Sequence, residues 1–155
     1  MSAPKKIYIA GPAVFHPDNG EAYYSNVRAL MKQKGVVPLI PVDNVATGAL
    51  NIRNKNIDMI QKCDAIIADL SPFRSKEPDC GTAFELGYAA ALGKPLLTFS
   101  TDNRPMVEKY GGEMSDGLSV ENFGLPFNLM LYDGTEVFDS FEAAFSYFVD
   151  HHLTQ

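Results

Sequence analysis

The chain contains 155 residues, a length that suits one domain built around one hydrophobic core. Its hydrophobic content of 46% is ordinary for a globular protein. Thirteen basic residues against nineteen acidic ones give a net charge of -6, which argues against a nucleic-acid backbone or an anionic membrane surface as the main partner. No stretch of the sequence approaches the roughly 18 consecutive apolar residues of a membrane helix.

The cysteines and the first residues bear on the cellular compartment. Cys63 and Cys80 form no C-x-x-C pair, which argues against a disulfide framework or a zinc knuckle. Residues 1–6 lead directly into an expected strand and lack the long apolar segment of a secretory signal. We therefore expect a protein of the reducing cytoplasm.

The first part of the chain predicts two strands and two helices. A short apolar run at residues 6–10 is typical of a central strand, and the Gly-Pro pair that follows predicts a turn. Apolar positions at helical spacing predict a helix over residues 21–34. Residues 36–42 predict a short edge strand, because two prolines interrupt this apolar run. A polar connection at 43–54 then leads to a helix expected over 54–63.

The middle of the chain repeats the alternation of strand and helix. Residues 65–70 are almost continuously apolar, which is typical of a strand buried in a parallel sheet. A loop with two prolines and two basic residues is expected at 71–78. A strongly apolar helix over 82–92 follows and is closed by Gly-Lys-Pro. Residues 96–99 predict the next strand.

The last part of the chain is less regular. Residues 100–124 are polar and contain glycine, with a short helix expected at 106–110. Residues 127–131 are expected to form a last strand or a docking segment. Aromatic and small apolar residues at helical spacing predict a packed helix over 138–152.

Strands that alternate with helices predict the class of fold. We expect a single α/β domain over residues 1–155, a Rossmann- or flavodoxin-like sandwich with a mainly parallel five-stranded sheet flanked by helices. In such folds, ligands bind beyond the carboxyl ends of the strands. The loops after Ala10, Val42, Asp69 and Phe99 are therefore the expected place for a site.

The segment Asp79-Cys-Gly-Thr-Ala-Phe-Glu85-Leu-Gly87 carries the strongest functional signal. A glycine turn leads into the expected helix, and Glu85 follows among apolar or small neighbours. The helix dipole favours an ionised carboxylate near the helix N-terminus. In a dry pocket, such a carboxylate can attack an electrophilic sugar carbon and form a covalent ester. A solvated glutamate early in a helix is the alternative, and this segment alone leaves the two interpretations even.

Three nearby residues could assist Glu85. Asp79 could protonate a leaving group while Glu85 attacks, as in retaining glycosyl transfer, although turn formation or helix capping is the commoner role of such an aspartate. Tyr8 lies in the first strand and could either donate a hydrogen bond to Glu85 or pack under a helix. Gly81 is interpreted as a position of close backbone approach.

Other polar residues are weaker candidates. Asp69 ends an apolar strand at the expected ligand-binding edge, but strand-end aspartates also cap loops, and we weight this structural role slightly higher. Asn56 and Asp58 could reach the same edge or face water. The sequence contains no metal-ligand constellation, no G-x-x-x-x-G-K-[ST] loop and no G-x-G-x-x-G fingerprint. We therefore expect neither a bound metal nor a cofactor.

Four short segments resemble the nucleoside 2-deoxyribosyltransferase family. They are Ile-Tyr-Ile-Ala-Gly-Pro at 7–12, Cys-Asp-Ala-Ile-Ile-Ala-Asp-Leu at 63–70, the segment at 79–87, and Pro-Phe-Asn-Leu-Met at 126–130. Each segment is short and degenerate, but they follow the family's order and span most of the chain. The ordered set is much more specific than any one of its members.

The resemblance implies a catalytic role for three residues. Glu85 would be the nucleophile that attacks the anomeric carbon of a 2'-deoxyribonucleoside. Tyr8 would hydrogen-bond the Glu85 carboxylate, and Asp79 would contact the nucleobase and handle its protonation.

The resemblance also implies the residues that bind substrate. Phe15 would help to wall the base, and Asn128, with Met130, would be donated by a neighbouring subunit to read the 5'-hydroxyl of the sugar. The active protein would then be a homo-oligomer, at least a dimer. The expected substrate-binding residues are Gly11, Phe15, Asn56, Asp58, Asp69, Gly81, Asn128 and Met130.

The expected reaction is transfer of 2-deoxyribose between free nucleobases, with net retention, through a covalent glutamyl-deoxyribosyl intermediate. This chemistry belongs to nucleoside salvage. One alternative is a 2'-deoxynucleoside 5'-monophosphate N-glycosidase, which uses water as acceptor. Arg74 and Lys76 keep that alternative open, whereas Asn128 favours a free nucleoside. A second alternative is a non-catalytic nucleotide-binding protein on the same fold.

Overall fold

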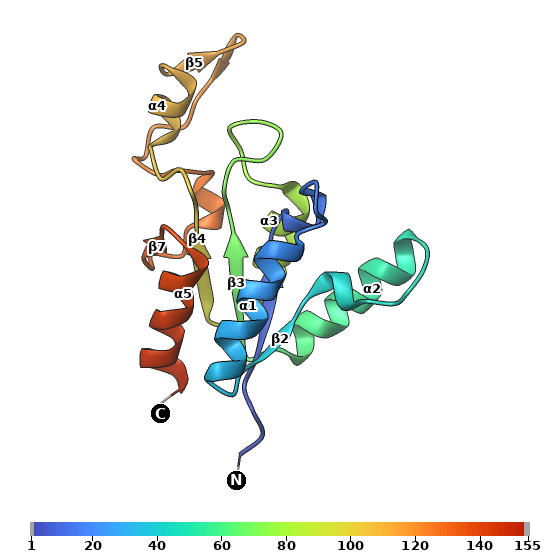
Figure 1. The fold of residues 1–155 in the computed structure, drawn as a ribbon. Helices are drawn as coiled ribbons and strands as arrows, with labels where there is room; N and C mark the ends of the chain where they lie inside the picture. The colour runs from blue at the N-terminus through green and yellow to red at the C-terminus, as the bar shows by residue number, and fades with distance from the viewer. Residues whose placement is uncertain (1, 154–155) are drawn as a thin grey trace.

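All strands of the main sheet run parallel, in the order β2-β1-β3-β4-β7, in the computed structural model, which describes residues 2–153 (Figure 1). The strands are β1 (Lys6–Ala10), β2 (Val37–Leu39), β3 (Ala65–Asp69), β4 (Leu96–Phe99) and β7 (Val137–Phe138). The helices are α1 (Glu21–Gln33), α2 (Ala49–Lys62), α3 (Cys80–Ala91), α4 (Met106–Tyr110) and α5 (Phe141–Phe148). The predicted α/β sandwich with a five-stranded sheet is confirmed.

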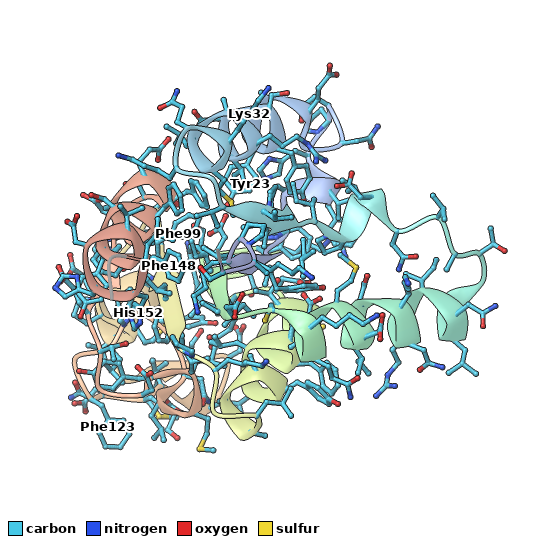
Figure 2. All side chains as sticks on the ribbon, turned by 90° about the horizontal axis from the view of Figure 1, so that it is seen from below. Tyr23, Lys32, Phe99, Phe123, Phe148 and His152 are labelled. Atoms are coloured by element: carbon cyan, nitrogen blue, oxygen red, sulfur yellow. The ribbon has the colours of Figure 1, made fainter. Side chains whose placement is uncertain are left out.

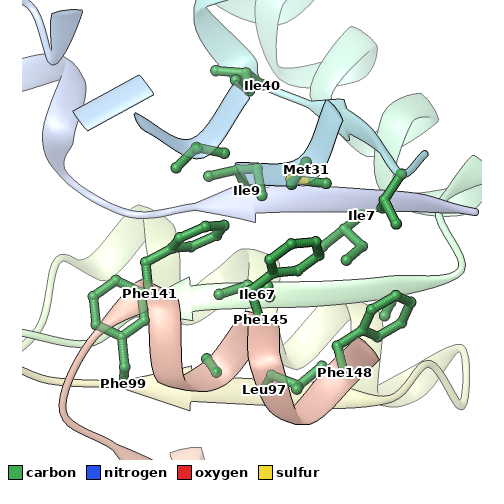
Figure 3. Packing of buried hydrophobic residues seen from close by; sticks show 14 of the residues in the cluster. Ile7, Ile9, Met31, Ile40, Ile67, Leu97, Phe99, Phe141, Phe145 and Phe148 are labelled. Carbon is green, nitrogen blue, oxygen red and sulfur yellow. The ribbon is translucent and has the colours of Figure 1, made fainter. Parts of the chain in front are cut away.

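One face of the sheet packs against α1 and α5. Alternate strand residues, such as Ile7 and Ile9 of β1, point to this face because side chains alternate along a strand. The aromatic side chains of α5 lie across β3 and β4 (Figure 3). They are Phe141, Phe145 and Phe148, and each is at most 5% exposed. Burial of each such ring stabilises the fold by roughly 2–3 kcal/mol.

The opposite face of the sheet packs against α2 and α3. Tyr8 and Ala10 of β1 point to this face, where they meet Leu86 of α3 and Ile60 of α2. Phe127 is fully buried in the same cluster and fixes the chain after residue 126 against the sheet. The alternation within β1 therefore sends Tyr8 toward the helix that carries Glu85.

Residues 100–126, which we call the arm, extend from the end of β4 away from the sheet (Figure 1). The arm contains α4 and a small antiparallel hairpin of β5 (Met114–Ser115) and β6 (Leu118–Ser119). Lys109 is buried, and its Nζ donates a hydrogen bond of 2.6 Å to the Pro126 carbonyl, which ties α4 to the last residue of the arm. Burial lowers the pKa of Lys109.

Two predicted elements differ in the structure. Residues 127–131 form no strand, because Asn128 caps a 3-10 turn, η3 (Leu129–Leu131), by accepting a hydrogen bond from the Met130 amide. The last strand is instead β7, which pairs with β4. The C-terminal helix begins at Phe141, where Ser140 is the N-cap, and α5 continues into a π-helical turn over Val149–Leu153.

Helix α2 begins at Ala49, five residues before the predicted start, because Gly48 with φ of 83° breaks the preceding chain at that point. None of the helices in residues 2–153 combines the length and the hydrophobicity that a membrane span requires.

Candidate active site

Tyr8 and Glu85 meet between the sheet and α3. Tyr8 is fully buried in β1, and its hydroxyl donates a hydrogen bond to Oε2 of Glu85, which lies in the second turn of α3. A buried tyrosine hydroxyl needs such a partner, because an unpaired polar group loses the hydrogen bonds that water would provide. The same bond fixes the direction of the Glu85 carboxylate.

Three effects set the ionisation of Glu85. Burial raises its pKa, the hydrogen bond from Tyr8 lowers it, and the nearby Asp79 charge raises it, with a net pKa of about 7. Burial and the Glu85 charge also raise the pKa of Tyr8 far above its ordinary value, so the phenol stays protonated. Glu85 is therefore a carboxylate that ionises near neutral pH and always has a donor beside it.

Asp79 combines a structural position with access to the site. It is the N-cap of α3, where its Oδ2 accepts hydrogen bonds from the Thr82 amide at 2.9 Å and the Thr82 hydroxyl at 2.8 Å. A Cβ at Gly81 would lie 3.3 Å from the same oxygen, so glycine leaves room beside the carboxylate. The expected capping role and exposure to the site thus occur together in one residue.

Asp79 and Glu85 both line a cavity of about 320 Å³, which lies between the first loop, α2 and the start of α3. This volume is within the range of small-molecule sites. Its walls are mostly apolar and come from four segments: the first loop, the turn at residue 41, α2 and α3. The large apolar side chains are Val14, Phe15, Pro41, Ile52, Ile57, Ile60 and Phe84. The polar lining residues are Tyr24, Arg53, Asn56, Asp79 and Glu85. Such a cavity fits a flat, largely apolar ligand with a few polar edges.

Several predicted residues line this cavity. Gly11 and Phe15 come from the first loop, Asn56 from α2, and Gly81 from the first turn of α3. Asn56 is oriented by Asn44, whose Nδ2 donates to Asn56 Oδ1 at 3.0 Å. The structure therefore brings together residues that lie up to 74 positions apart, Gly11 and Glu85, as the carboxyl-edge rule predicts.

Asp58 and Asp69 do not line the cavity. Asp58 is half-buried on α2, where it pairs with Lys62 at 2.8 Å and with Lys55 at 3.7 Å, and these contacts lower its pKa. Asp69 follows Ala68 in β3 and so points to the opposite face of the sheet from Tyr8.

Asp69 has a structural place instead. Burial raises the pKa of its carboxyl, and its Oδ1 accepts a hydrogen bond from the Ser71 amide at 2.9 Å. It also packs under Gly11, where an added Cβ would come within 2.8 Å of the Asp69 Cβ. Gly11 has φ of 154°, so both space and backbone conformation favour glycine there. Asp69 thus has a structural role, because it packs against Gly11 at the start of the first loop.

Asn128 and Met130 do not line the cavity that contains Glu85. Asn128 lines a second cavity of about 350 Å³ beside the arm, and its Nδ2 donates to Glu121 Oε1 at 2.9 Å. The second Glu121 oxygen accepts from the Leu129 amide at 3.0 Å. Met130 is 82% exposed.

Three residues that line the cavity were not expected from the sequence: Tyr24, Arg53 and Phe84. The guanidinium of Arg53 lies 5.3 Å from the centroid of the Phe84 ring, so the two side chains support each other. Arg53 precedes Asn56 by one helical turn, and this spacing would have identified it. Arg53 was not considered a site residue, because residues 43–54 were expected to form an irregular connection and not the start of a helix.

The site joins an ionisable carboxylate, a fixed hydroxyl donor, a second carboxylate and apolar walls. This arrangement can perform nucleophilic substitution at carbon, with Glu85 as the attacking group. Across residues 2–153, no group of three or more His, Cys, Asp or Glu side chains is placed to hold a metal ion.

A solved structure, a 2-desoxiribosyltransferase from Leishmania mexicana, is 88% identical to this chain, with a TM-score of 0.94. The match covers 96% of this chain and 99% of that one. A 2-deoxyribosyltransferase from Bacillus psychrosaccharolyticus is 23% identical with a TM-score of 0.59, covering 89% of this chain and 88% of that one. The second likeness concerns the fold alone.

Two curated proteins are similar over part of their length. An uncharacterized protein of Schizosaccharomyces pombe is 39% identical over 113 residues, which are 66% of this chain and 53% of that protein. The 5-hydroxymethyl-dUMP N-hydrolase of Rattus norvegicus is 27% identical over 104 residues, 61% of this chain and 60% of that protein. The matched regions thus span between half and two thirds of these two relatives.

The family model of the nucleoside 2-deoxyribosyltransferases matches residues 7–130, which cover all four segments that first suggested the resemblance. Together with the fold and the 88% identical structure, this match confirms the predicted family. The chain belongs to the nucleoside 2-deoxyribosyltransferase family.

Proposed function

We propose that this protein transfers 2-deoxyribose between the nucleobases of 2'-deoxyribonucleosides, with Glu85 as the covalent nucleophile. The observation that carries the proposal is the half-buried Glu85 carboxylate, which accepts a hydrogen bond from Tyr8 in a cavity that Asp79 also lines. The 88% identical 2-desoxiribosyltransferase supports the same reaction.

The first step breaks the bond between C1' and the base. The ionised Glu85 oxygen attacks C1' as that bond lengthens, and the sugar passes through a state with oxocarbenium character. The base leaves with the electron pair of the broken bond and accepts a proton that Asp79 has taken up from solvent when substrate binds. The product is an ester between Glu85 and C1', and Tyr8 holds the carboxylate in line for the attack.

The second step restores a nucleoside. A second base enters the vacated place, its nitrogen attacks C1', Asp79 takes back the proton, and Glu85 leaves as a carboxylate. Two inversions at C1' give net retention. The sugar lacks a 2'-hydroxyl, whose electron withdrawal would make the oxocarbenium-like state harder to reach, so deoxyribosides react more readily than ribosides.

We further propose that the active form is at least a dimer in which Asn128 completes the neighbour's site. Asn128 lines the cavity beside the arm and not the cavity that holds Glu85. Large apolar side chains on and next to the arm are exposed, including Leu118 at 73% and Phe123 at 66%. Phe123 points outward at the edge of the molecule (Figure 2). A second subunit would cover these side chains and supply the 5'-hydroxyl contact.

The proposal is tested by incubating the protein with 2'-deoxyinosine, with and without adenine. New 2'-deoxyadenosine in the presence of adenine supports transfer, whereas free deoxyribose alone identifies a hydrolase. Glu85→Gln should remain folded and lose transfer by several orders of magnitude, because the amide is no nucleophile. A 2-fluoro-2-deoxynucleoside should add a sugar mass to Glu85 in the native protein. Near-native turnover by Glu85→Gln would refute the mechanism.

One alternative has an observation in its favour. The similar rat protein is a 5-hydroxymethyl-dUMP N-hydrolase, whose name describes hydrolysis of a nucleoside monophosphate. The cavity beside Asn128 argues against a phosphate there, because Glu77, Asp116 and Glu121 line it and no lysine or arginine does among the described residues. Reaction with 2'-deoxyinosine 5'-monophosphate and not with 2'-deoxyinosine would establish the hydrolase instead.

A further inference from the structure

Arg53 is a cation in a cavity that otherwise carries two carboxylates. It lies in the second turn of α2 and lines the same cavity as Glu85 and Asp79. No other lysine or arginine lines that cavity in the part of the chain that the structure describes. Asn56, one helical turn further along α2, lines it too. Arg53 therefore faces the place where substrate binds under the proposed function.

The Arg53 guanidinium is positioned but not neutralised. It lies 5.3 Å from the centroid of the Phe84 ring, and Phe84 immediately precedes Glu85 in α3. Its hydrogen bond to Asn54 Oδ1 is long, at 3.4 Å, and within residues 2–153 it forms no ion pair. Its remaining donors are available to a ligand.

The chemistry of a guanidinium limits what that ligand group can be. The group carries five N–H donors and no acceptor, so it binds oxygen and ring nitrogen acceptors and opposes amino groups. A 2'-deoxyribonucleoside has no net charge, and in an oxo base such as that of 2'-deoxyinosine the carbonyl oxygen is a strong acceptor for such a donor.

Bond cleavage increases the need for such a donor. When the C1'–N bond breaks, its electron pair moves onto the base, and in an oxo base the negative charge spreads to the carbonyl oxygen. Glu85 loses its charge as it forms the ester, and Asp79 becomes negative as it gives up its proton, so neither side chain stabilises that charge. A guanidinium in the same cavity does stabilise it.

We propose that Arg53 donates a hydrogen bond to a carbonyl oxygen of the nucleobase and stabilises the negative charge on the leaving base, which favours oxo bases over amino bases. This inference rests on the proposed function and names the substrate class of the same site. Arg53 is then a specificity-determining residue in contact with the base.

The test compares two donors, 2'-deoxyinosine with a carbonyl at C6 and 2'-deoxyadenosine with an amino group there, with 2,6-diaminopurine as the common acceptor. Arg53→Met should lower kcat/KM about 10- to 100-fold for 2'-deoxyinosine, the range expected for one lost charged hydrogen bond, and less than about threefold for 2'-deoxyadenosine. Arg53→Lys keeps the positive charge but loses the planar set of guanidinium N–H donors. Its kcat/KM for 2'-deoxyinosine should lie between those of the wild type and Arg53→Met.

Lys55→Met is the matched control, because Lys55 lies on the same helix and pairs with Asp58 outside the cavity. Lys55→Met should leave kcat/KM unchanged for both 2'-deoxyinosine and 2'-deoxyadenosine. An equal loss for both donors in Arg53→Met, or no loss for either, would overturn the inference. A loss confined to 2'-deoxyinosine 5'-monophosphate would overturn it too, because Arg53 would then contact a phosphate.

A binding measurement separates this inference from the proposed reaction. Calorimetric titration with free hypoxanthine and free adenine needs no turnover. Weaker binding of hypoxanthine alone to Arg53→Met supports the Arg53 contact even where the wild-type protein transfers no sugar, an outcome that would refute the proposed function alone. Unchanged hypoxanthine binding would count against Arg53.

Discussion

Tyr8 and Glu85 are 77 positions apart in the chain and share a hydrogen bond from the Tyr8 hydroxyl to Glu85 Oε2. The contact exists because side-chain alternation in β1 turns Tyr8 toward α3, while the Asp79 cap starts α3 so that Glu85 lies over the strand. Burial and the Tyr8 donor act in opposite directions on Glu85, and burial prevails. The pH dependence of this protein should therefore report the balance between these two residues.

The rate of transfer should rise with pH through the ionisation of Glu85. In the proposed mechanism only the ionised Glu85 carboxylate attacks C1', and burial together with Asp79 raises its pKa to about 7. We expect kcat/KM for 2'-deoxyinosine to increase tenfold per pH unit below about pH 6 and to level off above about pH 8. Initial rates in buffers of constant ionic strength measure this profile. A rate that is flat between pH 5 and 8 would show that Glu85 is not the group that limits attack.

Tyr8→Phe should move that profile to higher pH. The hydroxyl lowers the pKa of Glu85, so its removal lets the pKa rise further, while the ring keeps its place in the core. We expect a loss of about tenfold even at high pH, because the carboxylate is no longer held for attack. The same pH series measures both effects. A profile with the wild-type midpoint would mean that Tyr8 has no influence on the charge of Glu85.

The free energy of unfolding should fall as Glu85 ionises. Its pKa is about 7 in the folded chain against an ordinary value of 4.5, so the folded protein binds the proton more tightly. The stabilisation is present in full below pH 4.5 and is lost as the pH rises to about 7, by roughly 3 kcal/mol.

Glu85→Gln isolates this effect, because its side-chain oxygen still accepts from Tyr8 but carries no titrating proton. Urea unfolding measures the free energy of unfolding of both proteins at several pH values. The value for Glu85→Gln should increase relative to that of the wild type between pH 4.5 and 7, and the difference should be constant above about pH 8. Parallel curves for the two proteins would contradict the raised pKa.

The central strands could be predicted almost to the residue. Residues 6–10 and 96–99 form strands as expected, because a buried parallel strand is apolar on both faces and its signal is local. The start of α2 could not be predicted in this way, because all residues of its first two turns are exposed and form no continuous buried apolar face. Strand β7 is two residues long and is defined by its pairing with β4, which no local pattern encodes.

Site residues could be predicted where one short segment contains them. They could not be predicted where the register of neighbouring strands decides which face of the sheet a side chain lies on. Glu85 and Asp79 follow from one short segment. The face on which Asp69 lies follows from the register of Tyr8 opposite Ile66, which puts Asp69 on the other side of the sheet. That register is a property of the assembled sheet, and the sequence of β3 alone does not contain it.

Mixing two inactive variants tests whether Asn128 acts across subunits. Glu85→Gln lacks the proposed nucleophile, and Asn128→Ala lacks the proposed 5'-hydroxyl contact, so each alone should be nearly inactive. In a mixed dimer, one site takes Glu85 from one subunit and Asn128 from the other and is complete, whereas the second site lacks both. Random exchange makes half of the dimers mixed, so an equal mixture should regain about a quarter of wild-type activity.

The control for subunit mixing replaces Asn128→Ala by a second Glu85 variant, Glu85→Ala, in which no pairing restores a nucleophile. That mixture should stay inactive at every ratio. Restored activity in the first mixture should also depend on prior exchange of subunits, because Asn128 lines a cavity separate from that of Glu85 within one chain. If exchange is shown by mass spectrometry and activity still stays absent, Asn128 serves its own subunit or none, since a shared site would have been rebuilt.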